Sequence, residues 1–334
     1  MPMTLGRVRL ARCVIMSVAI ALGGCAAAPA VIDGTAPRFV PPLPSSRAGV
    51  ALVLSAGAAR GYAHVGVIKA LEANGLRPDL VVGASAGAVV GALYASGLTP
   101  AELEAAVARM RPSTFTDLSL PGFGILPGSL GLFRGDELHS FIDREVRRSR
   151  IEEFPIRFAA VATDLGSGEP VIFNAGDVGR AVAASSAVPG LIAPARIGGK
   201  LYADGQISSP APVEVARKLG ARKVILVDVV YPPEDAVLTS SMRVVFQAFT
   251  IAAHRLKQHE VAMADVLVVP ELGRTSGQWG FGERGRLIAE GERATLNALP
   301  RLRPLFAPPT RVDGQEASRP DHGWSGTGRF SSQP

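Results

Sequence analysis

The sequence contains little cysteine, few aromatic residues and no dense tract of basic residues. Two of its 334 residues are cysteine, so an apolar core rather than a disulfide framework must stabilise the fold. Aromatic residues make up 6% of the chain, and no Lys/Arg tract is interleaved with them, which argues against nucleic acid as a partner. No internal repeat divides the chain, and its formal charge is only +6. What remains is a globular protein with a mildly basic surface.

The N-terminal residues have the pattern of a secretory signal. Arginines within residues 7–12 precede the apolar run 14–22, which is too short to cross a hydrocarbon layer of about 30 Å. The run leads into a Leu-Gly-Gly-Cys segment at Cys25 that resembles the lipobox of bacterial lipoproteins. That resemblance implies cleavage before Cys25 and acylation of its thiol. Ordinary cleavage within residues 26–28 is the alternative.

The two ends of the chain set the expected domain boundaries. We expect a signal peptide over residues 1–24, a Pro/Ala-rich linker over 25–48, one folded domain over 49–305 and a disordered tail over 306–334. The lipoprotein resemblance implies an exported, membrane-anchored protein. It also implies residence in the outer membrane, facing the periplasm, because Ala26 rather than aspartate follows the cysteine. The sequence leaves the oligomeric state open.

Short apolar runs alternate with amphipathic or alanine-rich stretches along the domain. Nearly continuous Val/Ile/Leu strands separated by helices indicate a mostly parallel sheet that is covered on both faces. The sequence therefore predicts an α/β fold with three layers, α/β/α. Strands are expected at 50–54, 80–82, 158–163, 171–173, 201–203, 224–227 and 266–269. Helices are expected at 61–74, 86–96, 101–109, 136–146, 177–184, 212–219, 240–262 and 285–298.

One serine stands between an apolar strand and an Ala/Gly-rich helix, in the segment Gly83-Ala84-Ser85-Ala86-Gly87. A sharp strand-to-helix turn brings its flanks close together, so Gly83 and Gly87 are expected where a Cβ would clash. The turn lifts the Ser85 hydroxyl above the sheet at a helix N-terminus, where negative charge is favoured. A nucleophile is presented in this way. The pattern G-x-S-x-G alone arises by chance roughly 0.3 times in a chain of this composition, so its surroundings must decide.

A turn of small residues, Leu54–Gly61, lies between the first expected strand and the first expected helix. Its backbone N–H groups point outward and can hold an anion. The turn lacks the glycine and lysine spacing of dinucleotide- and nucleotide-binding loops. The G-x-G-x-x-G pattern at Gly280–Gly285 follows no strand directly and is attributed to chance. An oxyanion hole is the favoured interpretation of the turn, and a tight helix entry is the alternative.

The stretch from Arg111 to Leu132 breaks the alternation of strands and helices. It is rich in Pro, Gly and Ser, with Phe and Leu interspersed, and long irregular loops in compact domains tend to be functional or mobile. Two interpretations stay open. The stretch is either a lid that admits an acyl chain to the serine, or a loop whose apolar residues attach it to the surface.

Four short segments belong together: residues 54–70, the serine turn 83–87, Ala-Ser-Ser-Ala-Val-Pro-Gly at 184–190 and Tyr-Ala-Asp-Gly at 202–205. In this order they resemble the motif set of bacterial patatin-like phospholipases, over about residues 49–305. The resemblance implies a lipid acyl hydrolase whose substrate is a lipid or phospholipid and which uses no cofactor. The site residues it implies are Ser85 as nucleophile, Asp204 as its partner in a catalytic dyad, Ala56, Gly57 and Ala58 in the oxyanion loop, and Arg60, Gly61, Gly83, Gly87 and Gly205 as supports.

The mechanism that this resemblance implies is ester hydrolysis in two steps. Ser85 attacks the acyl carbonyl while Asp204 accepts the proton directly, and water activated by Asp204 then hydrolyses the acyl-serine. An aspartate with an ordinary pKa near 3.9 is a weak base, so limited hydration must raise its pKa. No metal ion is needed, and no His, Cys or carboxylate cluster has the sequence spacing of a metal site.

Two departures from the family pattern concern the loop and the surroundings of the dyad. The oxyanion loop of the family is usually a run of glycines, whereas Ala56 and Ala58 stand here. If either alanine adopts a positive φ, its Cβ costs about 1–2 kcal/mol. The residue after Asp204-Gly205 is commonly small, yet here it is Gln206. A lipid-binding or scaffold lipoprotein with the same fold and little turnover is therefore the second hypothesis.

Five other polar residues are open to more than one interpretation. A Ser–Asp–His triad with His254 or His259 has the correct chain order, but both histidines lie within one expected helix rather than in a loop. For His64 a structural role is favoured over a catalytic one. Arg60 has either a carboxylate partner or a substrate phosphate as its partner. Asp164 is interpreted as part of a turn at a strand end and not as a base.

Overall fold

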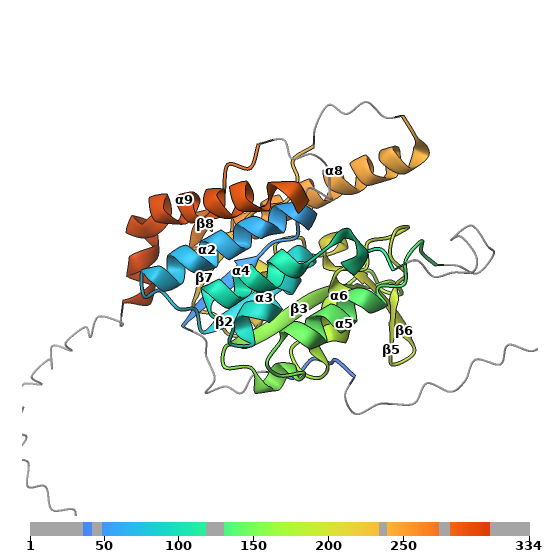
Figure 1. Ribbon diagram of the computed structural model, residues 1–334, viewed down its shortest axis with the longest axis horizontal. Coiled ribbons are helices and arrows are strands. Elements are labelled where there is room, and N and C mark those ends of the chain that lie inside the picture. The colour runs from blue at the N-terminus through green and yellow to red at the C-terminus, as the bar shows by residue number, and fades with distance from the viewer. Residues whose placement is uncertain (1–35, 42–48, 118–129, 234–238, 274–280, 308–334) are drawn as a thin grey trace, which may run out of the picture.

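The computed structural model describes residues 36–41, 49–117, 130–233, 239–273 and 281–307. In this part of the chain one eight-stranded sheet has the order β5-β6-β3-β2-β1-β7-β8, with β4 also paired to β3 (Figure 1). The expected signal peptide with its lipobox cysteine, most of the linker and most of the expected tail lie outside the described residues. The strands are β1 (Val50–Leu54), β2 (Leu80–Ala84), β3 (Arg157–Asp164), β4 (Pro170–Phe173), β5 (Ala195–Ile197), β6 (Lys200–Asp204), β7 (Lys223–Val227) and β8 (Val266–Val268).

The sheet is mostly parallel, as the sequence predicts. β1 pairs in parallel with β2 and β7, β2 with β3, and β7 with β8. β4, β5 and β6 add antiparallel pairs on the side of β3. The sequence does not predict β5, because its three residues include the exposed Arg196 and form no apolar run.

Helices cover both faces of the sheet and complete the three predicted layers (Figure 1). On one face α2, α3, α5, α6 and α9 pack against residues such as Leu52 and Leu54, while on the other α7 and the end of α8 pack against Val53 and Leu226. Neighbouring residues of a strand thus enter opposite layers. The helices are α2 (Tyr62–Ala73), α3 (Ala86–Ala95), α4 (Pro100–Arg109), α5 (Asp136–Glu145), α6 (Val178–Ser185), α7 (Val213–Lys218), α8 (Ser241–Val261) and α9 (Arg284–Leu302). None of the helices in the described ranges is long and apolar enough to cross a membrane.

The helix ends lie within one residue of the sequence prediction, except for the C-terminal end of α9. A 3₁₀ turn, Ala58–Gly61, precedes α2, which therefore begins at Tyr62. Helix α9 continues through Pro300 to Leu302 instead of ending at Ala298. Burial of the Leu302 side chain in the core favours this extra turn and outweighs the proline.

Strand β3 positions the functional site, because two strands share one of its edges. Val161 pairs with β4 on one edge and with Ala84, the last residue of β2, on the other. The next residue, Ala162, pairs with β4 again and with Asp204, the last residue of β6. β2 and β6 therefore follow one another along the same edge of β3. The residues after Ala84 meet the end of β6 at the carboxyl edge of the sheet.

Candidate active site

Ser85 occupies the sharp turn between β2 and α3, as the sequence predicts. Its backbone has φ +52° and ψ −120°, a conformation that costs a residue with a side chain on the order of 1–3 kcal/mol. A Cβ on Gly83 would lie 2.3 Å from the carbonyl oxygen of Gly87, and a Cβ on Gly87 would lie 2.0 Å from that of Leu54. Both positions therefore require glycine, and the strained turn places Ser85 at the N-terminus of α3.

The register of β3 brings the two predicted dyad residues into contact. The Oγ of Ser85 donates a hydrogen bond of 2.8 Å to Oδ2 of Asp204, across 119 positions of sequence. The N–H of Asp204 donates to the carbonyl oxygen of Ala187 at 2.9 Å. The carbonyl oxygen of Asp204 accepts from the Thr163 hydroxyl at 2.8 Å. Backbone bonds on both sides thus fix the carboxyl group that faces the serine.

Asp204 is almost fully buried, with 1% of its surface exposed. Burial raises the pKa of its carboxyl group to about 6, although hydrogen bonds from the Gln206 N–H and the Ser85 hydroxyl lower it. The Gln206 donor is a backbone N–H, 2.8 Å from Oδ1, so this contact does not depend on the side chain that departs from the family pattern. A carboxylate with this pKa is a stronger base than an ordinary aspartate and is ionised at neutral pH.

Ser185, at the end of α6, supports the turn in a way that the sequence pattern does not indicate. Its hydroxyl accepts a hydrogen bond of 3.0 Å from the N–H of Ser85 and donates one of 2.6 Å to the carbonyl oxygen of Val161. The N–H of Ser85 is therefore engaged, and donors for an oxyanion have to come from another segment. Ser185 stands in the motif 184–190, but only the fold shows what it contacts.

The predicted oxyanion loop lies beside Ser85 but offers fewer N–H groups than predicted. The N–H of Ala56 donates to the carbonyl oxygen of Pro210 at 2.8 Å, which leaves Gly57 and Ala58 as candidate donors. Ala58 is the first residue of the 3₁₀ turn, so its N–H has no partner within that turn. Ala58 and Ser85 line the same pocket.

The two alanines of this loop differ in backbone conformation. Ala58 adopts φ +44° and Ala56 has no positive φ, so the cost of about 1–2 kcal/mol for a left-handed residue with a Cβ applies to one of them. Gly57 between them is required by space, because a Cβ there would lie 2.7 Å from the carbonyl oxygen of Val229. The loop thus keeps a strained shape without the run of glycines.

Ser55 and His64 hold the loop in place. The Ser55 hydroxyl accepts from the N–H of Val229 at 2.8 Å and donates to the carbonyl oxygen of Ala56 at 3.1 Å. Nε2 of His64 lies 2.9 Å from the carbonyl oxygen of Ser55, so Nε2 carries the proton. Burial lowers the pKa of His64 to about 4, which keeps the imidazole neutral at physiological pH. These contacts agree with the structural role that the sequence favours for His64.

Gly61 and Gly205, two predicted supports of the site, stand where the backbone is crowded. A Cβ on Gly61 would lie 2.6 Å from the Cβ of Ala86, directly after the serine. A Cβ on Gly205 would lie 2.1 Å from the carbonyl oxygen of Val161. Each glycine therefore lets a segment of the site approach its neighbour.

The remaining polar residues of the sequence analysis lie in other surroundings. The Arg60 guanidinium lies 5.0 Å from the centre of the Tyr231 ring, a cation–π contact that neither interpretation of this arginine included. His254 and His259 lie on α8, and neither lines the pocket that contains the serine. Asp164 ends β3 and accepts a hydrogen bond from the N–H two residues further on, as expected of a turn at a strand end.

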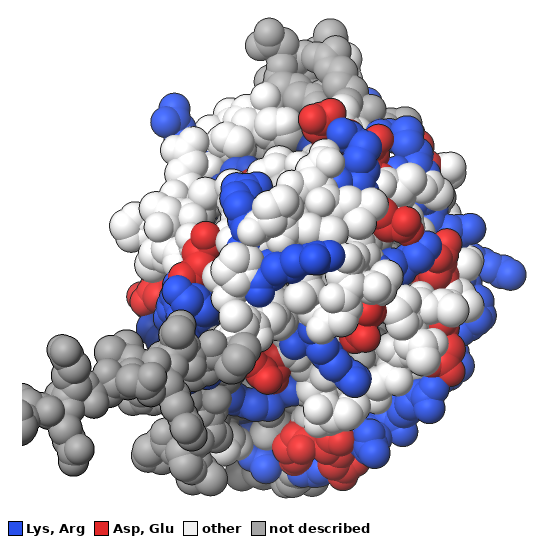
Figure 2. Space-filling view, turned by 90° about the vertical axis from the view of Figure 1, so that its left-hand side faces the viewer, with Lys and Arg blue, Asp and Glu red and all other residues white. Residues whose placement is uncertain are grey.

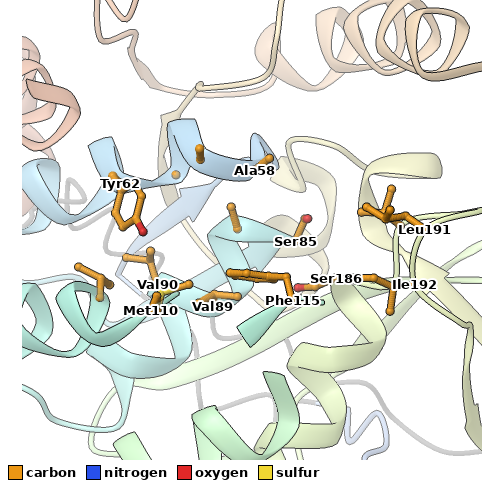
Figure 3. A pocket seen from close by; sticks show the side chains of 15 residues that line it. Ala58, Tyr62, Ser85, Val89, Val90, Met110, Phe115, Ser186, Leu191 and Ile192 are labelled. Carbon is orange, nitrogen blue, oxygen red and sulfur yellow. The ribbon is translucent and has the colours of Figure 1, made fainter. Parts of the chain in front are cut away.

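An open, mainly apolar pocket surrounds Ser85 (Figure 3). It encloses about 700 Å³, including its mouth. Figure 3 shows Tyr62 and Met110 on one side of the serine and Leu191 on the other. The Ser186 hydroxyl oxygen is buried in the wall and has no hydrogen-bond partner among the described residues. The lining residues are Ala58, Ala59, Gly61, Tyr62, Ser85, Ala86, Val89, Val90, Val107, Met110, Phe115, Ser186, Val188, Leu191 and Ile192.

The stretch 111–132 contributes to this pocket. Phe115 is one of its lining residues, and Phe133 directly after the stretch is bridged to Ile192 in the wall. Residues 118–129 lie outside the described ranges. Both interpretations of the stretch, a lid and an attached loop, therefore stay predictions.

His139, Asp143 and Asp177 bring three potential metal-ligand atoms within 4.8 Å of one another, a cluster that sequence spacing did not indicate. Nε2 of His139 lies 3.1 Å from Oδ2 of Asp143 and 3.4 Å from Oδ1 of Asp177. The neighbouring carboxyl group of Asp177 raises the pKa of His139. Asp177 also accepts a bond of 2.7 Å from the N–H of Arg180, at the start of α6. Ion pairing between α5 and α6 accounts for these contacts, and none of the three residues lines the pocket.

The residues around Ser85 can together carry out acyl transfer. A hydroxyl in contact with a basic carboxylate can act as a nucleophile. Backbone N–H groups of the neighbouring loop can stabilise an oxyanion, and apolar walls suit a hydrocarbon chain. The geometry contains each part that such a reaction needs.

Known proteins match the part of the chain that holds these residues. Residues 52–217 match the family described as patatin-like phospholipase. An uncharacterised NTE family protein of Mycobacterium tuberculosis is 39% identical over 169 residues, which cover 51% of this chain and 46% of that protein. Lysophospholipase NTE1 of Debaryomyces hansenii is 33% identical over 190 residues, which cover 55% of this chain and 12% of that protein.

These matches are partial in length. The chain spans less than half of each of these two relatives. Among solved structures, VipD from Legionella pneumophila is similar with a TM-score of 0.47 and 15% sequence identity, over 75% of this chain and 66% of that chain.

Proposed function

We propose that this chain, whose residues 52–217 match the patatin-like phospholipase family and which is similar to proteins of the NTE family, is a lipid acyl hydrolase that cleaves fatty-acyl esters. The observation that carries the proposal is the hydrogen bond of 2.8 Å between Ser85 Oγ and Asp204 Oδ2. This pair adjoins an apolar pocket. A strained turn and a buried carboxyl group both cost folding free energy, and such costs are concentrated at functional sites.

In the first step, Oγ of Ser85 attacks the acyl carbonyl carbon while its proton passes to Oδ2 of Asp204. The oxyanion that forms accepts hydrogen bonds from the N–H groups of Gly57 and Ala58. When the tetrahedral intermediate collapses, the bond to the alcohol oxygen breaks and the proton on Asp204 passes to the leaving alkoxide. The step yields an ester on Ser85, a free alcohol and an ionised Asp204.

In the second step, Asp204 takes a proton from water as the water oxygen attacks the acyl-Ser85 carbonyl carbon. The same two loop N–H groups stabilise the second oxyanion. The bond between the acyl carbon and Oγ then breaks, and the proton returns from Asp204 to Oγ. A fatty acid leaves and the free enzyme is restored. The Ser186 hydroxyl, buried in the pocket wall, is available to hydrogen-bond the ester group of the substrate.

The substrate that we propose is a phospholipid or a lysophospholipid. Aliphatic side chains of Val89, Val90, Val107 and Met110 line the pocket, and each CH₂ group buried against such walls contributes roughly 0.8 kcal/mol to binding. The name lysophospholipase, which belongs to one of the relatives, agrees with a substrate of this class.

We also propose that the protein is exported and anchored by an acylated Cys25 in the outer membrane, facing the periplasm. The support is the short apolar run and the Leu-Gly-Gly-Cys segment of the sequence. Mass spectrometry of the N-terminal peptide from protein made in a bacterial host tests this. We expect an acylated Cys25 at the N-terminus. An unmodified N-terminus within residues 26–28 would contradict it.

Hydrolysis of a bacterial phospholipid extract in ¹⁸O-labelled water tests the proposed activity. The full chain is expected to release fatty acids with one ¹⁸O atom, together with lysophospholipids or glycerophosphodiesters. Release is lost in Ser85→Ala and retained in Ser96→Ala, a buried serine at the other end of α3. Absence of labelled fatty acid with the unaltered chain would contradict the proposal.

A lipid-binding or scaffold protein with little turnover is the second candidate function. Two observations favour it, the engaged N–H of Ala56 and the left-handed backbone of Ala58, because both restrict the oxyanion hole. This candidate predicts that the chain binds a fluorescent lysophospholipid and releases no fatty acid from it. Equal turnover by the unaltered chain and by Ser85→Ala would likewise favour binding over catalysis.

A further inference from the structure

Helix α8 is longer than the strands that it connects. It follows β7 and precedes β8, and these strands are parallel, so it runs back along the sheet from the carboxyl edge to the amino edge. Its 21 residues span about 32 Å at a rise of about 1.5 Å per residue. The five residues of β7 span about 17 Å. Part of α8 must therefore extend past the sheet.

Contacts of the C-terminal half of α8 fix this half against the sheet. Lys257 forms a buried ion pair with Asp228, the residue directly after β7. Glu260, one turn further on, accepts a hydrogen bond of 2.7 Å from the hydroxyl of Ser209. Lys257 therefore lies level with the carboxyl edge of the sheet, and everything C-terminal to it runs toward the amino edge.

The N-terminal half of α8 projects beyond the carboxyl edge. Residues 241–252 precede Ala253, the first residue of the helix that is described as buried. Figure 1 shows this half extending away from the body of the domain. The carboxyl edge is also the edge that holds Ser85 and Asp204. The projecting half thus stands at the end of the sheet that holds Ser85 and Asp204.

The exposed side of this half is apolar. Helical spacing of four and seven residues places Val244, Ala248 and Ile251 on one stripe, and Val245 and Leu256 adjoin it. Val244, Val245, Ile251 and Leu256 are 49%, 56%, 42% and 39% exposed. The side that faces the domain carries the buried Lys257 and Glu260 instead. The usual distribution of apolar and charged residues is therefore reversed on α8. The residues of this exposed stripe are Val244, Val245, Ala248, Ile251, Ala252 and Leu256.

The charged residues that α8 itself places beside the exposed stripe have one sign. Arg243 precedes it and Arg255 lies near its end, and both are exposed. No Asp or Glu occurs between Ser240 and His259. An apolar stripe whose charged neighbours on α8 are cations is complementary to a bilayer surface with anionic head groups, where apolar side chains enter the acyl boundary and cations meet phosphates.

We infer that the projecting half of α8 docks on an anionic phospholipid bilayer, with its exposed stripe in the interface and the pocket mouth beside the membrane surface. The inference rests on the proposed function, because docking on a membrane serves this protein only if its substrate is a lipid ester that leaves the membrane to enter the pocket. It does not rest on the acylated cysteine, since the stripe belongs to the folded domain. A second copy of the chain fits the stripe less well, because a symmetric pair brings cations together with no acidic residue between them.

Binding to vesicles of equimolar phosphatidylglycerol and phosphatidylcholine tests this inference. The full chain carries Cys25→Ser and Ser85→Ala in all samples, so that neither an acyl anchor nor hydrolysis affects binding. Adding Val245→Gln and Ile251→Gln is expected to weaken the partition coefficient by about ten-fold. Glutamine favours helix more than valine or isoleucine, so the helix itself is retained. Equal binding with and without these two substitutions overturns the inference.

The matched control is Leu296→Gln on α9, an aliphatic side chain that is 51% exposed outside the exposed stripe. Its partition coefficient is expected to stay within about two-fold of the parent value. A loss as large as that of the α8 variant overturns the inference, because any exposed aliphatic side chain would then contribute equally to vesicle binding. Sedimentation velocity tests whether a second copy of the chain occupies the exposed stripe. A dimer that only the α8 substitutions dissociate, with unchanged vesicle binding, assigns the exposed stripe to a second copy and also overturns it.

A soluble ester separates this inference from the proposed function. In the Cys25→Ser chain with Ser85 retained, hydrolysis of a monomeric short-chain ester is expected to be unchanged by the α8 substitutions. Hydrolysis of vesicle lipid is expected to fall by about as much as binding. If the parent chain cleaves neither ester but still binds vesicles through α8, the proposed function fails and the docking inference stands.

Discussion

Asp265 and Asp204, at opposite ends of the central sheet, have pKa values that are shifted in opposite directions. At the amino edge, Asp265 accepts hydrogen bonds from the N–H of Val224 and from the side chains of Lys223 and Arg217. Burial raises the pKa of Asp265, but these donors outweigh it and the pKa is lowered. At the carboxyl edge, Asp204 has no cationic partner in the described part of the chain, and burial raises its pKa to about 6.

Backbone and surface show the same division. Ala58 and Ser85 are the described residues that combine a side chain with a positive φ, and both lie at the carboxyl edge. At the amino edge, Gly75 adopts φ +70° in open space, at no steric cost. Figure 2 shows the amino-edge face covered by interspersed basic and acidic residues, whereas the projecting part of α8 is apolar. The amino edge thus carries little backbone strain, whereas the carboxyl edge holds a strained turn and a buried carboxyl group.

The largest expected difference separates two serines at opposite ends of α3. Ser85→Ala should lower kcat/KM for a soluble ester by at least about 10⁴-fold, because the proposed nucleophile is lost. Ser96 donates a hydrogen bond of 2.8 Å to the carbonyl oxygen of Leu93, so Ser96→Ala should cost about 1 kcal/mol of stability and leave the rate unchanged. Initial rates and urea unfolding measure the two effects. Loss of activity in both variants would contradict the different roles assigned to the serines at the two ends of α3.

Two glycines sharpen the contrast in backbone crowding. Gly87→Ala should destabilise the fold by about 4 kcal/mol or more, or prevent folding, because its Cβ meets the carbonyl oxygen of Leu54. Gly75→Ala should cost only about 1–2 kcal/mol, from its left-handed backbone. Urea unfolding monitored by circular dichroism gives both values. Similar losses at the two positions would show that crowding at the serine turn has been overestimated.

The two aspartates should respond to pH in different ranges. The folded pKa of Asp204, about 6, lies above the unfolded value near 3.9, so its contribution to stability is lost as pH rises from about 4 to 6, by roughly 3 kcal/mol. Asp204→Asn should therefore gain roughly that much relative to the unaltered chain over this range. The pKa of Asp265 is lowered in the folded state. Its contribution to stability is therefore present above the unfolded pKa and is lost only as the pH falls below that value, toward the folded pKa.

Free energies of unfolding at about pH 4, 5, 6 and 7, on both sides of the pKa of Asp204, check this expectation. Asp265→Asn is the matched variant, and its difference from the unaltered chain should stay nearly constant over this range. Parallel curves for the two variants would mean that Asp204 is not held as a weak acid in the folded state.

The smallest expected effect has opposite signs at the two ends. Ala58→Gly should stabilise the fold by up to about 1 kcal/mol, because the left-handed backbone no longer carries a Cβ. Ala73 is the last residue of α2, at the amino edge, and Ala73→Gly should destabilise by about 0.5–1 kcal/mol. Thermal and urea unfolding of the two variants give the sign of each change in the free energy of unfolding. Destabilisation by both would remove the strain assigned to Ala58.

Local spacing explains what the sequence could predict. The alternation of strands and helices follows from apolar periodicity, and the turn at Ser85 follows from two glycines and one serine within five residues. Asp204 became a candidate only through resemblance to a family, since nothing near it in the chain refers to Ser85. The β3 register that joins the two residues is a tertiary feature. Contacts such as those of Ser185 and Ala56 depend on that register and were not predictable.

The exposed stripe of α8 also could not be predicted from the sequence. A helix over 240–262 follows from its pattern, but an apolar stripe looks the same in sequence whether it is buried or exposed. Only the contact of Lys257 with Asp228 and the exposure of the residues before it reveal that half of α8 lies beyond the sheet.

The pH dependence of fluorophosphonate labelling tests most directly whether Ser85 is activated by Asp204. We expect a single adduct on the peptide that contains Ser85, formed at a rate that rises with pH and is half-maximal near the pKa of Asp204, about 6. Asp204→Asn should abolish the rise. An adduct on another serine, or a rate on Ser85 that is the same with and without the carboxyl group of Asp204, would contradict the account.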